Sequence, residues 1–505
     1  MTAPRAGGPA RPDDRPAEET LDPSDWGAMR ALGHRMVDEM VTYLETVRDR
    51  PAWQAMPDEV KAGLRAPLPL EPRPAEAVYE DFRRLVLPYP LGNIHPRFWG
   101  WVIGTGTPLG ALSEMLAATM NPNVGGADHA ACHVEAQVLA WCREMLDFPR
   151  EASGLLVSGG SVANLVGLAG GRNAKAEVDV AQAGLRAAPR RMTLYASSET
   201  HNSVKKAVSL LGLGRDALRE VPVDGDFRVD LAALRTAIAA DRAAGCHPFG
   251  VVGNAGTVNT GAIDDLPALA DLCRAQNLWF HVDGAFGALA ALSPALRERV
   301  RGMERADSLA FDLHKWMYMP FEVGCVLVRH PEAHHATFTA PAEYLARAER
   351  GTAAGPTWFS EYGMQLSRGF RALKVWMSLK EHGARRYGRL IAQNVAQARH
   401  LTERIQRTPE LELMAPTALN IVCFRFRGEG LDEASLDRLN QEVLLEIQEA
   451  GIAVPTSTKL RGRVALRVAI VNHRSRREDF DLLVGEVVAR GRRLAQTMAQ
   501  AGARG

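Results

Sequence analysis

An aspartate and a lysine that each follow an apolar run are the residues of this chain best suited to covalent chemistry. Asp283 ends the run that starts at Leu278, and Lys315 follows the run 308–313. In an open α/β sheet, ligands bind along the edge formed by the carboxyl ends of the strands. The 32 positions between the two residues (315 − 283) leave room for one strand–helix–strand crossover. A Schiff-base lysine near an acid that can pair with a pyridinium nitrogen is what pyridoxal phosphate (PLP) requires.

Lysine is scarce in the chain, which narrows the choice of that residue. The lysines are Lys61, Lys175, Lys205, Lys206, Lys315, Lys374, Lys380 and Lys459. Among them, Lys315 alone directly follows an apolar, strand-like run and lies beside aromatic residues. An apolar run ending in Asp is common in doubly wound sheets, and a His-Lys pair usually lies in a solvated loop. Neither motif alone is therefore sufficient to identify a PLP site.

Taken together, the two motifs resemble those of the PLP-dependent group II amino-acid decarboxylases, which include the aromatic-L-amino-acid and glutamate decarboxylases. The matching stretches are His-Val-Asp-Gly-Ala-Phe at 281–286 and Asp-Leu-His-Lys-Trp at 312–316. The family usually carries Pro where this chain has Leu313. The resemblance covers roughly residues 25–490. It implies that Lys315 holds PLP and that Asp283 keeps the ring nitrogen protonated.

Further cofactor contacts are expected from the same resemblance. It places Asp312 and His314 in the cofactor site, a stacking imidazole at His201, and Ala285 against the opposite ring face. It also places a threonine near the cofactor at Thr257. The family's second threonine is replaced here by Val258.

A strand, a glycine turn and a helix are predicted around Gly160 and Ser161. Glycines let the backbone approach a ligand, and a helix N-terminus offers free N–H groups to an anion. The resemblance makes this turn the phosphate site. No G-x-G-x-x-G pattern occurs, which argues against a dinucleotide-binding oxidoreductase.

The substrate pocket is expected to take its walls from a segment rich in aromatic residues. The family has a His-Pro-x-Phe stretch at 95–98, so Trp101, Val102 and His95 are the candidate wall residues. Arg467 lies in a segment that resembles the strand whose arginine holds a substrate carboxylate in related aminotransferases. The alternative is that Arg467 is a structural residue at a domain junction.

One position, on a loop expected to close over the site, leaves open whether the product is an amine or an aldehyde. Family members close a loop over the site, and a tyrosine on that loop is assigned proton delivery to Cα. An ungapped alignment anchored on 366–374 places Phe359 at that position. In the family, phenylalanine there is associated with aldehyde-forming members that use oxygen. Alternatively, Tyr362, Tyr344, His201 or a water supplies the proton.

Composition indicates a globular protein and excludes several classes of partner. The chain has 505 residues, 46% hydrophobic and 24% charged, with a net charge of +1, so a nucleic-acid partner is not expected. Because no apolar run approaches the roughly 20 residues of a membrane span, no membrane association is expected. The scattered cysteines argue against a metal site and for reduced thiols in a cytoplasm. They are Cys132, Cys142, Cys246, Cys273, Cys325 and Cys423.

An apolar stripe at helical spacing predicts a helix that begins after Asp25. Its members are Met29, Leu32, Met36, Val37, Met40, Val41, Leu44 and Val47. The stripe either packs on its own chain or, as the resemblance implies, crosses a homodimer interface.

Strands and helices alternate between about residues 154 and 330, which predicts a mainly parallel sheet with helices on both faces. The resemblance implies the aspartate-aminotransferase-like PLP fold (fold type I), with a smaller C-terminal α/β domain. The expected divisions are a disordered tail (1–24), a helical segment packing on the dimer partner (25–97), a large PLP-binding domain (98–371) and a small domain (372–498).

The expected activity is that of a cytoplasmic, homodimeric carboxy-lyase. It would convert an L-amino acid to the amine and CO2. An aromatic substrate is expected, because Trp99, Trp101, Trp358 and Phe359 supply an apolar lining. An aldehyde synthase or an aminotransferase on the same scaffold is the enzymatic alternative. The non-enzymatic alternative is a dimeric protein that keeps the fold without a cofactor.

Overall fold

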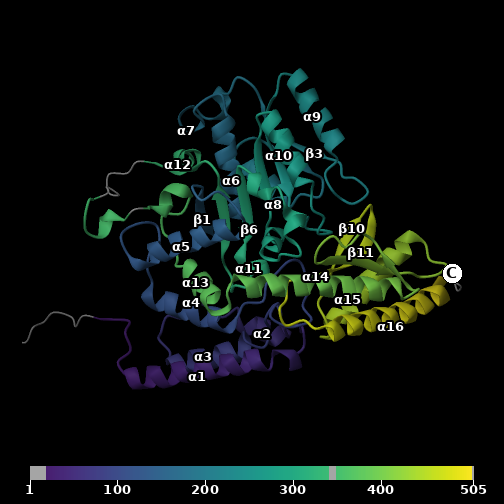
Figure 1. The fold of residues 1–505 in the computed structure, drawn as a ribbon. Helices are drawn as coiled ribbons and strands as arrows, with labels where there is room; N and C mark the ends of the chain where they lie inside the picture. The colour runs from purple at the N-terminus through teal and green to yellow at the C-terminus, as the bar shows by residue number, and fades with distance from the viewer. Residues whose placement is uncertain (1–18, 341–347, 356, 503–505) are drawn as a thin grey trace, which may run out of the picture.

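A seven-stranded sheet forms the centre of this computed structural model, which describes residues 19–340, 348–355 and 357–502 (Figure 1). Its strands are β1 (Ser153–Val157), β2 (Met192–Ser197), β3 (Leu218–Val221), β4 (His247–Asn254), β5 (Trp279–Asp283), β6 (Ser308–Asp312) and β7 (Gly324–Val328). They lie in the order β1-β7-β6-β5-β4-β2-β3. Only β7 is antiparallel to its neighbours. The predicted mainly parallel sheet is confirmed.

Helices cover both faces of this sheet, as predicted. α6 (Gly160–Lys175) and α8 (Asn202–Leu210) lie on one face, and α9 (Leu231–Ala243) and α10 (Leu266–Ala275) lie on the other. This division follows from right-handed crossovers between parallel strands. The connections through α6 and α8 lead toward the β3 edge of the sheet, whereas those through α9 and α10 lead back toward β5. Strands covered on both faces are mostly apolar, and every residue of β2, β5, β6 and β7 is buried, including polar residues such as His281 and Ser308.

The connection between Asp283 and Lys315 differs from the predicted single helix. Three short 3-10 turns replace it: η4 (Gly287–Leu292), η5 (Arg297–Val300) and η6 (Met303–Arg305). Pro294 interrupts the run because it lacks an N–H. Gly302 has a φ of 100°, a left-handed conformation that ends regular helix.

A second, antiparallel sheet lies beside the first (Figure 1). It contains β8 (Leu411–Leu413), β9 (Ile421–Phe426), β10 (Thr456–Leu460) and β11 (Arg463–Ala469), in the order β10-β11-β9-β8. α15 (Glu433–Glu449) and α16 (Arg477–Gly502) share an apolar core with it. The sequence predicts β9 and β11 but misses β8 and β10. β10 is partly exposed and polar, so it carries little apolar signal.

The linking helices are α13 (Ala372–His382) and α14 (Ala384–Gln406). α13 packs against α4 (Pro108–Met120) and α5 (Ala130–Met145), although the sequence places it in the small domain. The predicted boundary between the large and small domains, at residue 371, stays a prediction. The shorter helices are α2 (Asp58–Gly63), α7 (Val180–Ala183), α11 (Leu313–Trp316) and α12 (Pro331–Phe338).

The N-terminal helix α1 (Trp26–Glu45) lies beside α3 (Ala75–Leu85) at the lower edge of Figure 1. The Asp25 side chain accepts hydrogen bonds from the first N–H groups of α1, so the predicted helix start is confirmed. Large apolar side chains remain exposed on α1, α3 and α4, and we call them the exposed apolar face. They are Trp26, Met29, Met36, Val41, Val78, Leu112, Met115, Leu116 and Met120. Of the helices in the described ranges, none is both long and apolar enough to cross a bilayer.

Candidate active site

The carboxyl ends of β4, β5 and β6 meet the small domain around a cavity of about 300 Å³. Residues singled out from the sequence that line it are Trp101, Val102, His201, Asp283, Ala285, Lys315 and Arg467. The fold thus brings together the acid, the lysine and the imidazole expected at one site. β10 completes the wall with Thr456, Ser457 and Thr458.

Lys315 stands on α11, directly after β6. Its Nζ forms an ion pair with Asp312 Oδ2 at 2.8 Å. Asp312 is buried, and its Oδ1 has no hydrogen-bond partner among the described residues. A buried carboxylate oxygen without a partner is costly, and this one belongs to the carboxylate that pairs with Lys315.

Asp283 ends β5 with a donor at each carboxylate oxygen. Oδ1 accepts from the Ala285 N–H at 3.1 Å, and Oδ2 accepts from Asn164 Nδ2 at 2.9 Å. Asn164 is a site residue that the sequence reading missed. A signal was present, because Asn164 shares the buried face of α6 with Gly160 and Gly167 at helical spacing.

His201 precedes the first turn of α8 and caps it. Its Nδ1 accepts from the Ser203 backbone N–H at 3.2 Å and lies 2.8 Å from Ser203 Oγ. Burial lowers the pKa of His201, Asp283 acts against that shift, and Lys315 adds to it. The ring is therefore neutral at pH 7. Because Nδ1 is occupied by Ser203, Nε2 is the ring nitrogen left to interact with a ligand.

The start of α6 can hold an anion. No side chain caps this 16-residue helix, whose first residues are Gly160 and Ser161, so its N–H groups and dipole are available. A Cβ on Gly160 would lie 2.8 Å from Asp312 Oδ2 and 3.5 Å from Ala285 Cβ. The turn therefore lies against the cavity, and only glycine leaves that space open. An open helix start, a lysine, an acid and an imidazole around one cavity fit PLP.

The predicted site residues that do not line the cavity include Gly160, Ser161, Asp312, His95, Thr257 and His314. His95 is buried, burial lowers its pKa to about 4, and its Nδ1 accepts from Arg97 N. Thr257 is buried, with its Oγ1 accepting from Ala262 N at 3.1 Å. The His314 ring bonds the main chain of Val323, which fixes the turn before Lys315.

Phe359, at the expected proton-delivery position, and Tyr362, a candidate substitute, do not line this cavity, whereas His201, another candidate donor, does. Phe359, in η9 (Phe359–Tyr362), is buried with its ring 5.2 Å from the guanidinium carbon of Arg368, and it does not line the Lys315 cavity of its own chain. The Tyr362 ring packs edge-on against His334 at 5.1 Å. Tyr344 lies outside the described residues.

Arg467 is engaged with the main chain. Its guanidinium donates to the carbonyls of Asn259 (3.0 Å), Trp101 (2.8 Å) and Val258. Burial lowers its pKa to about 10. These bonds tie β11 to the loop after β4 and to the segment at Trp101. The geometry supports the junction role over a carboxylate-binding role.

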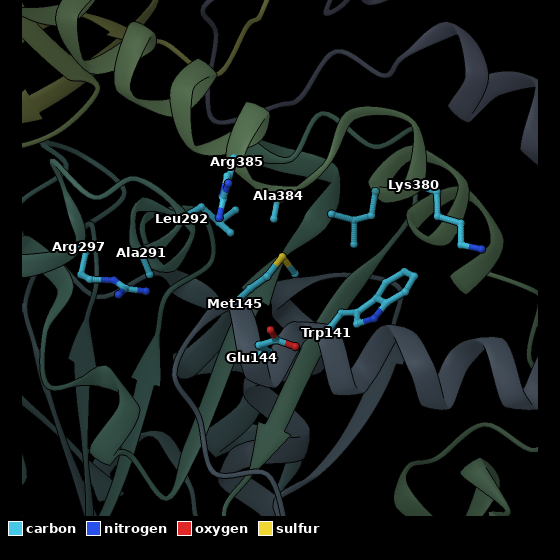
Figure 2. Close-up of a pocket in the computed structure, with 10 residues that line it drawn as sticks. Trp141, Glu144, Met145, Ala291, Leu292, Arg297, Lys380, Ala384 and Arg385 are labelled. Carbon is cyan, nitrogen blue, oxygen red and sulfur yellow. The ribbon is translucent and has the colours of Figure 1, made fainter.

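A separate cavity of about 420 Å³ lies between α5, η4, η5, α13 and α14 (Figure 2). Trp141, Met145 and Leu292 give it apolar walls, while Arg297 and Arg385 are exposed side chains at its rim. It contains none of the residues around Lys315. This cavity therefore offers no comparable set of acid, lysine and imidazole.

Comparison with known proteins gives consistent results. A model of the pyridoxal-dependent decarboxylase conserved domain matches residues 57–427. The aromatic-L-amino-acid decarboxylase of Bacillus atrophaeus is 33% identical over 90% of this chain and 93% of that protein. The phenylacetaldehyde synthase of Arabidopsis thaliana is 28% identical over 90% and 93%. The crystal structure of Oryza sativa TDC with PLP and tryptamine superposes with a TM-score of 0.86, at 26% identity, over 94% of this chain and 100% of that one.

Proposed function

Because this chain belongs to the family of pyridoxal-dependent decarboxylases, with PLP as its cofactor, we propose that it converts an aromatic L-amino acid to the corresponding amine and CO2. The observation that carries the proposal is the position of Lys315 Nζ. It lies in one cavity with Asp283 and His201 and faces apolar walls.

The cavity lining supports an aromatic substrate. Trp101, Val102 and Phe286 offer apolar surface, which binds a ring through burial and stacking. A buried acidic side chain would need a cationic partner. Arg467 is the arginine among the lining residues, and main-chain carbonyls occupy three of its N–H groups. The names of the Bacillus relative and of the rice structure with tryptamine agree with this choice.

The residues around the cavity suit the removal of a carboxylate. PLP held by Lys315 supplies an electron-withdrawing ring that weakens a bond at the substrate Cα. Asp283 would pair with the ring nitrogen, His201 would pack on the ring face, and Gly160 and Ser161 would hold the phosphate. Apolar walls exclude water and disfavour the substrate carboxylate relative to neutral CO2. A proton must then reach Cα.

An amino-acid panel tests the proposal. CO2, amine, aldehyde and hydrogen peroxide are measured together for tryptophan, tyrosine, phenylalanine, histidine and glutamate. We expect aromatic amine and CO2 in equal amounts without peroxide. Aldehyde with peroxide would instead indicate the activity named for the Arabidopsis relative. A keto acid without CO2 would indicate an aminotransferase, and a protein that binds no cofactor would refute an enzymatic role.

We also propose that the protein is a homodimer that buries the exposed apolar face. Several large apolar side chains are exposed on α1, α3 and α4, and exposed apolar patches mark association sites. α1 also covers little of the chain's own core, with Leu32 as its buried residue. Removal of residues 1–50 should therefore give monomers or aggregates by analytical ultracentrifugation. A soluble, active dimer after truncation would contradict this role of α1. The six cysteines are all free thiols, which supports the proposed cytoplasmic location.

A further inference from the structure

A chain of buried hydrogen bonds leads from the core of the sheet to the two groups expected to hold the cofactor ring. Asn164, on α6, stands at its branch point. Asn164 Nδ2 lies 2.9 Å from Asp283 Oδ2 and 2.9 Å from Ser203 Oγ, and its Oδ1 lies 2.9 Å from His281 Nε2. Asn164 and His281 are both buried.

The neighbours of Asn164 settle which way its amide points. With the amide reversed, its carbonyl oxygen would face the Asp283 carboxylate at 2.9 Å, which sets two acceptors against each other. In the orientation described, both N–H groups donate and Oδ1 accepts. His281 must therefore carry its hydrogen on Nε2.

The far end of the chain agrees with this assignment. His281 Nδ1 is then an acceptor and lies 2.8 Å from Ser308 Oγ. Ser308 Oγ accepts from Trp279 Nε1 at 2.8 Å, so its hydroxyl hydrogen can donate to His281, which is nearer than the Gly167 carbonyl at 3.5 Å. Every donor along this path meets an acceptor.

The branch toward His201 has the same directionality. Ser203 Oγ accepts from Asn164, and its hydroxyl hydrogen points to His201 Nδ1 at 2.8 Å. The backbone N–H of Ser203 donates to the same nitrogen. Two donors at Nδ1 leave Nε2 as the protonated nitrogen of the neutral His201 ring.

We propose that Asn164 is a positioning residue for the cofactor ring. It holds the Asp283 carboxylate as an acceptor for the ring nitrogen and, through Ser203, keeps His201 in the Nε2–H form. In that form His201 can donate a hydrogen bond but has no second hydrogen to give away as an acid. The inference rests on the proposed roles of Asp283 and His201.

The test compares how tightly the apoprotein binds PLP and 1-deaza-PLP, in which a C–H replaces the ring nitrogen. Asn164→Asp sets a second carboxylate 2.9 Å from Asp283, and two such groups share one proton. The preference for PLP over the deaza analogue, as a ratio of Kd values, should fall about tenfold to a hundredfold, the range typical of residues that hold a ligand group in place. Asn164→Ser, which buries no new charge, should lower the ratio in the same direction.

Asn440→Asp is the matched control. Asn440 is equally buried but bonds the main chain of Phe426 in the small domain, so its variant should keep the wild-type ratio. Asp283→Asn should lower the ratio as Asn164→Asp does. If Asp283→Asn lowers it and both Asn164 variants do not, the inference on Asn164 is wrong and the proposed site stands. If Asp283→Asn leaves it unchanged, the proposed role of Asp283 fails.

Discussion

Two buried acid–base pairs in this chain differ in what surrounds the base. Lys315 pairs with Asp312 at the cavity, and its side chain is 21% exposed. Arg368 pairs with Glu135, and their side chains are 1% and 0% exposed. Arg368 also donates to the carbonyls of Val124 and Leu156. The first base can meet a ligand, whereas the second is sealed by protein.

The sealed pair has a structural function. Burial raises the pKa of Glu135, and Arg368 acts against that shift. The pair joins α5 and β1 to the loop at Val124, where the Arg368 carbonyl also accepts the Val124 N–H. A buried charge pair alone therefore does not identify a catalytic site. An opening beside the base, with further polar groups around it, does.

The largest effect is expected at the open pair. Lys315→Ala removes the amine that would bind the cofactor, so activity should fall by several orders of magnitude. Borohydride reduction of the wild type should attach the cofactor to the peptide that contains Lys315. Lys374→Met is the matched control, because Lys374 is also buried in an ion pair, with Glu114 at 2.9 Å. Label on the Lys374 peptide would reverse the assignment of the two lysines.

The sealed pair should affect stability instead. Glu135→Ala leaves Arg368 buried and unpaired, which typically costs about 3–5 kcal/mol of unfolding free energy. Urea unfolding measures this loss. Glu220→Ala, which breaks the exposed pair with Lys205, should cost about 1 kcal/mol or less. Equal losses in the two variants would remove the distinction between buried and exposed pairs.

The buried hydrogen-bond network around His281 should make the stability of the protein depend on pH. Burial lowers the pKa of His281 to about 4, against 6.5 for the free side chain. The unfolded chain therefore binds this proton first as pH falls, so the contribution to stability is complete above about pH 6.5 and is lost toward pH 4. The full difference corresponds to about 3 kcal/mol. Urea unfolding measures this effect. Between pH 7 and pH 4, the unfolding free energy of His281→Gln should fall by about 3 kcal/mol less than that of the wild type. An unchanged pH dependence would mean that His281 is not a neutral, buried imidazole.

The smallest effect is expected at Phe359. Its ring packs on Arg368 of the sealed pair, so a tyrosine hydroxyl must fit a filled, buried space at a cost of about 1–3 kcal/mol. Phe359→Tyr should leave the ratio of amine to aldehyde unchanged in a product assay. A shift toward amine would show that the residue reaches an active site, as the ungapped alignment predicts.

Much of the fold was predictable because it follows from local patterns. Apolar runs of strand length, with helical stripes between them, specify a parallel sheet, and Asp25 specifies the start of α1. The meeting of Asp283 and Lys315 was also predictable, since strand ends in a parallel sheet meet at one edge, whereas His201 followed from the family resemblance. The strands β8 and β10 were not predictable, because short, polar edge strands resemble loops.

By itself, the sequence determined the class of the protein: its family motifs, its cofactor and the order of its strands and helices. Only the tertiary structure decided which polar residues work together. Asn164 and His281 lie 117 positions apart, yet their side chains share one hydrogen bond. Phe359 and Arg467 have suggestive sequence neighbours, but one packs on a sealed ion pair and the other bonds carbonyls at the domain junction. A side chain's role depends on the partners that satisfy its polar groups once water is excluded, and those partners come from distant segments that no local pattern specifies.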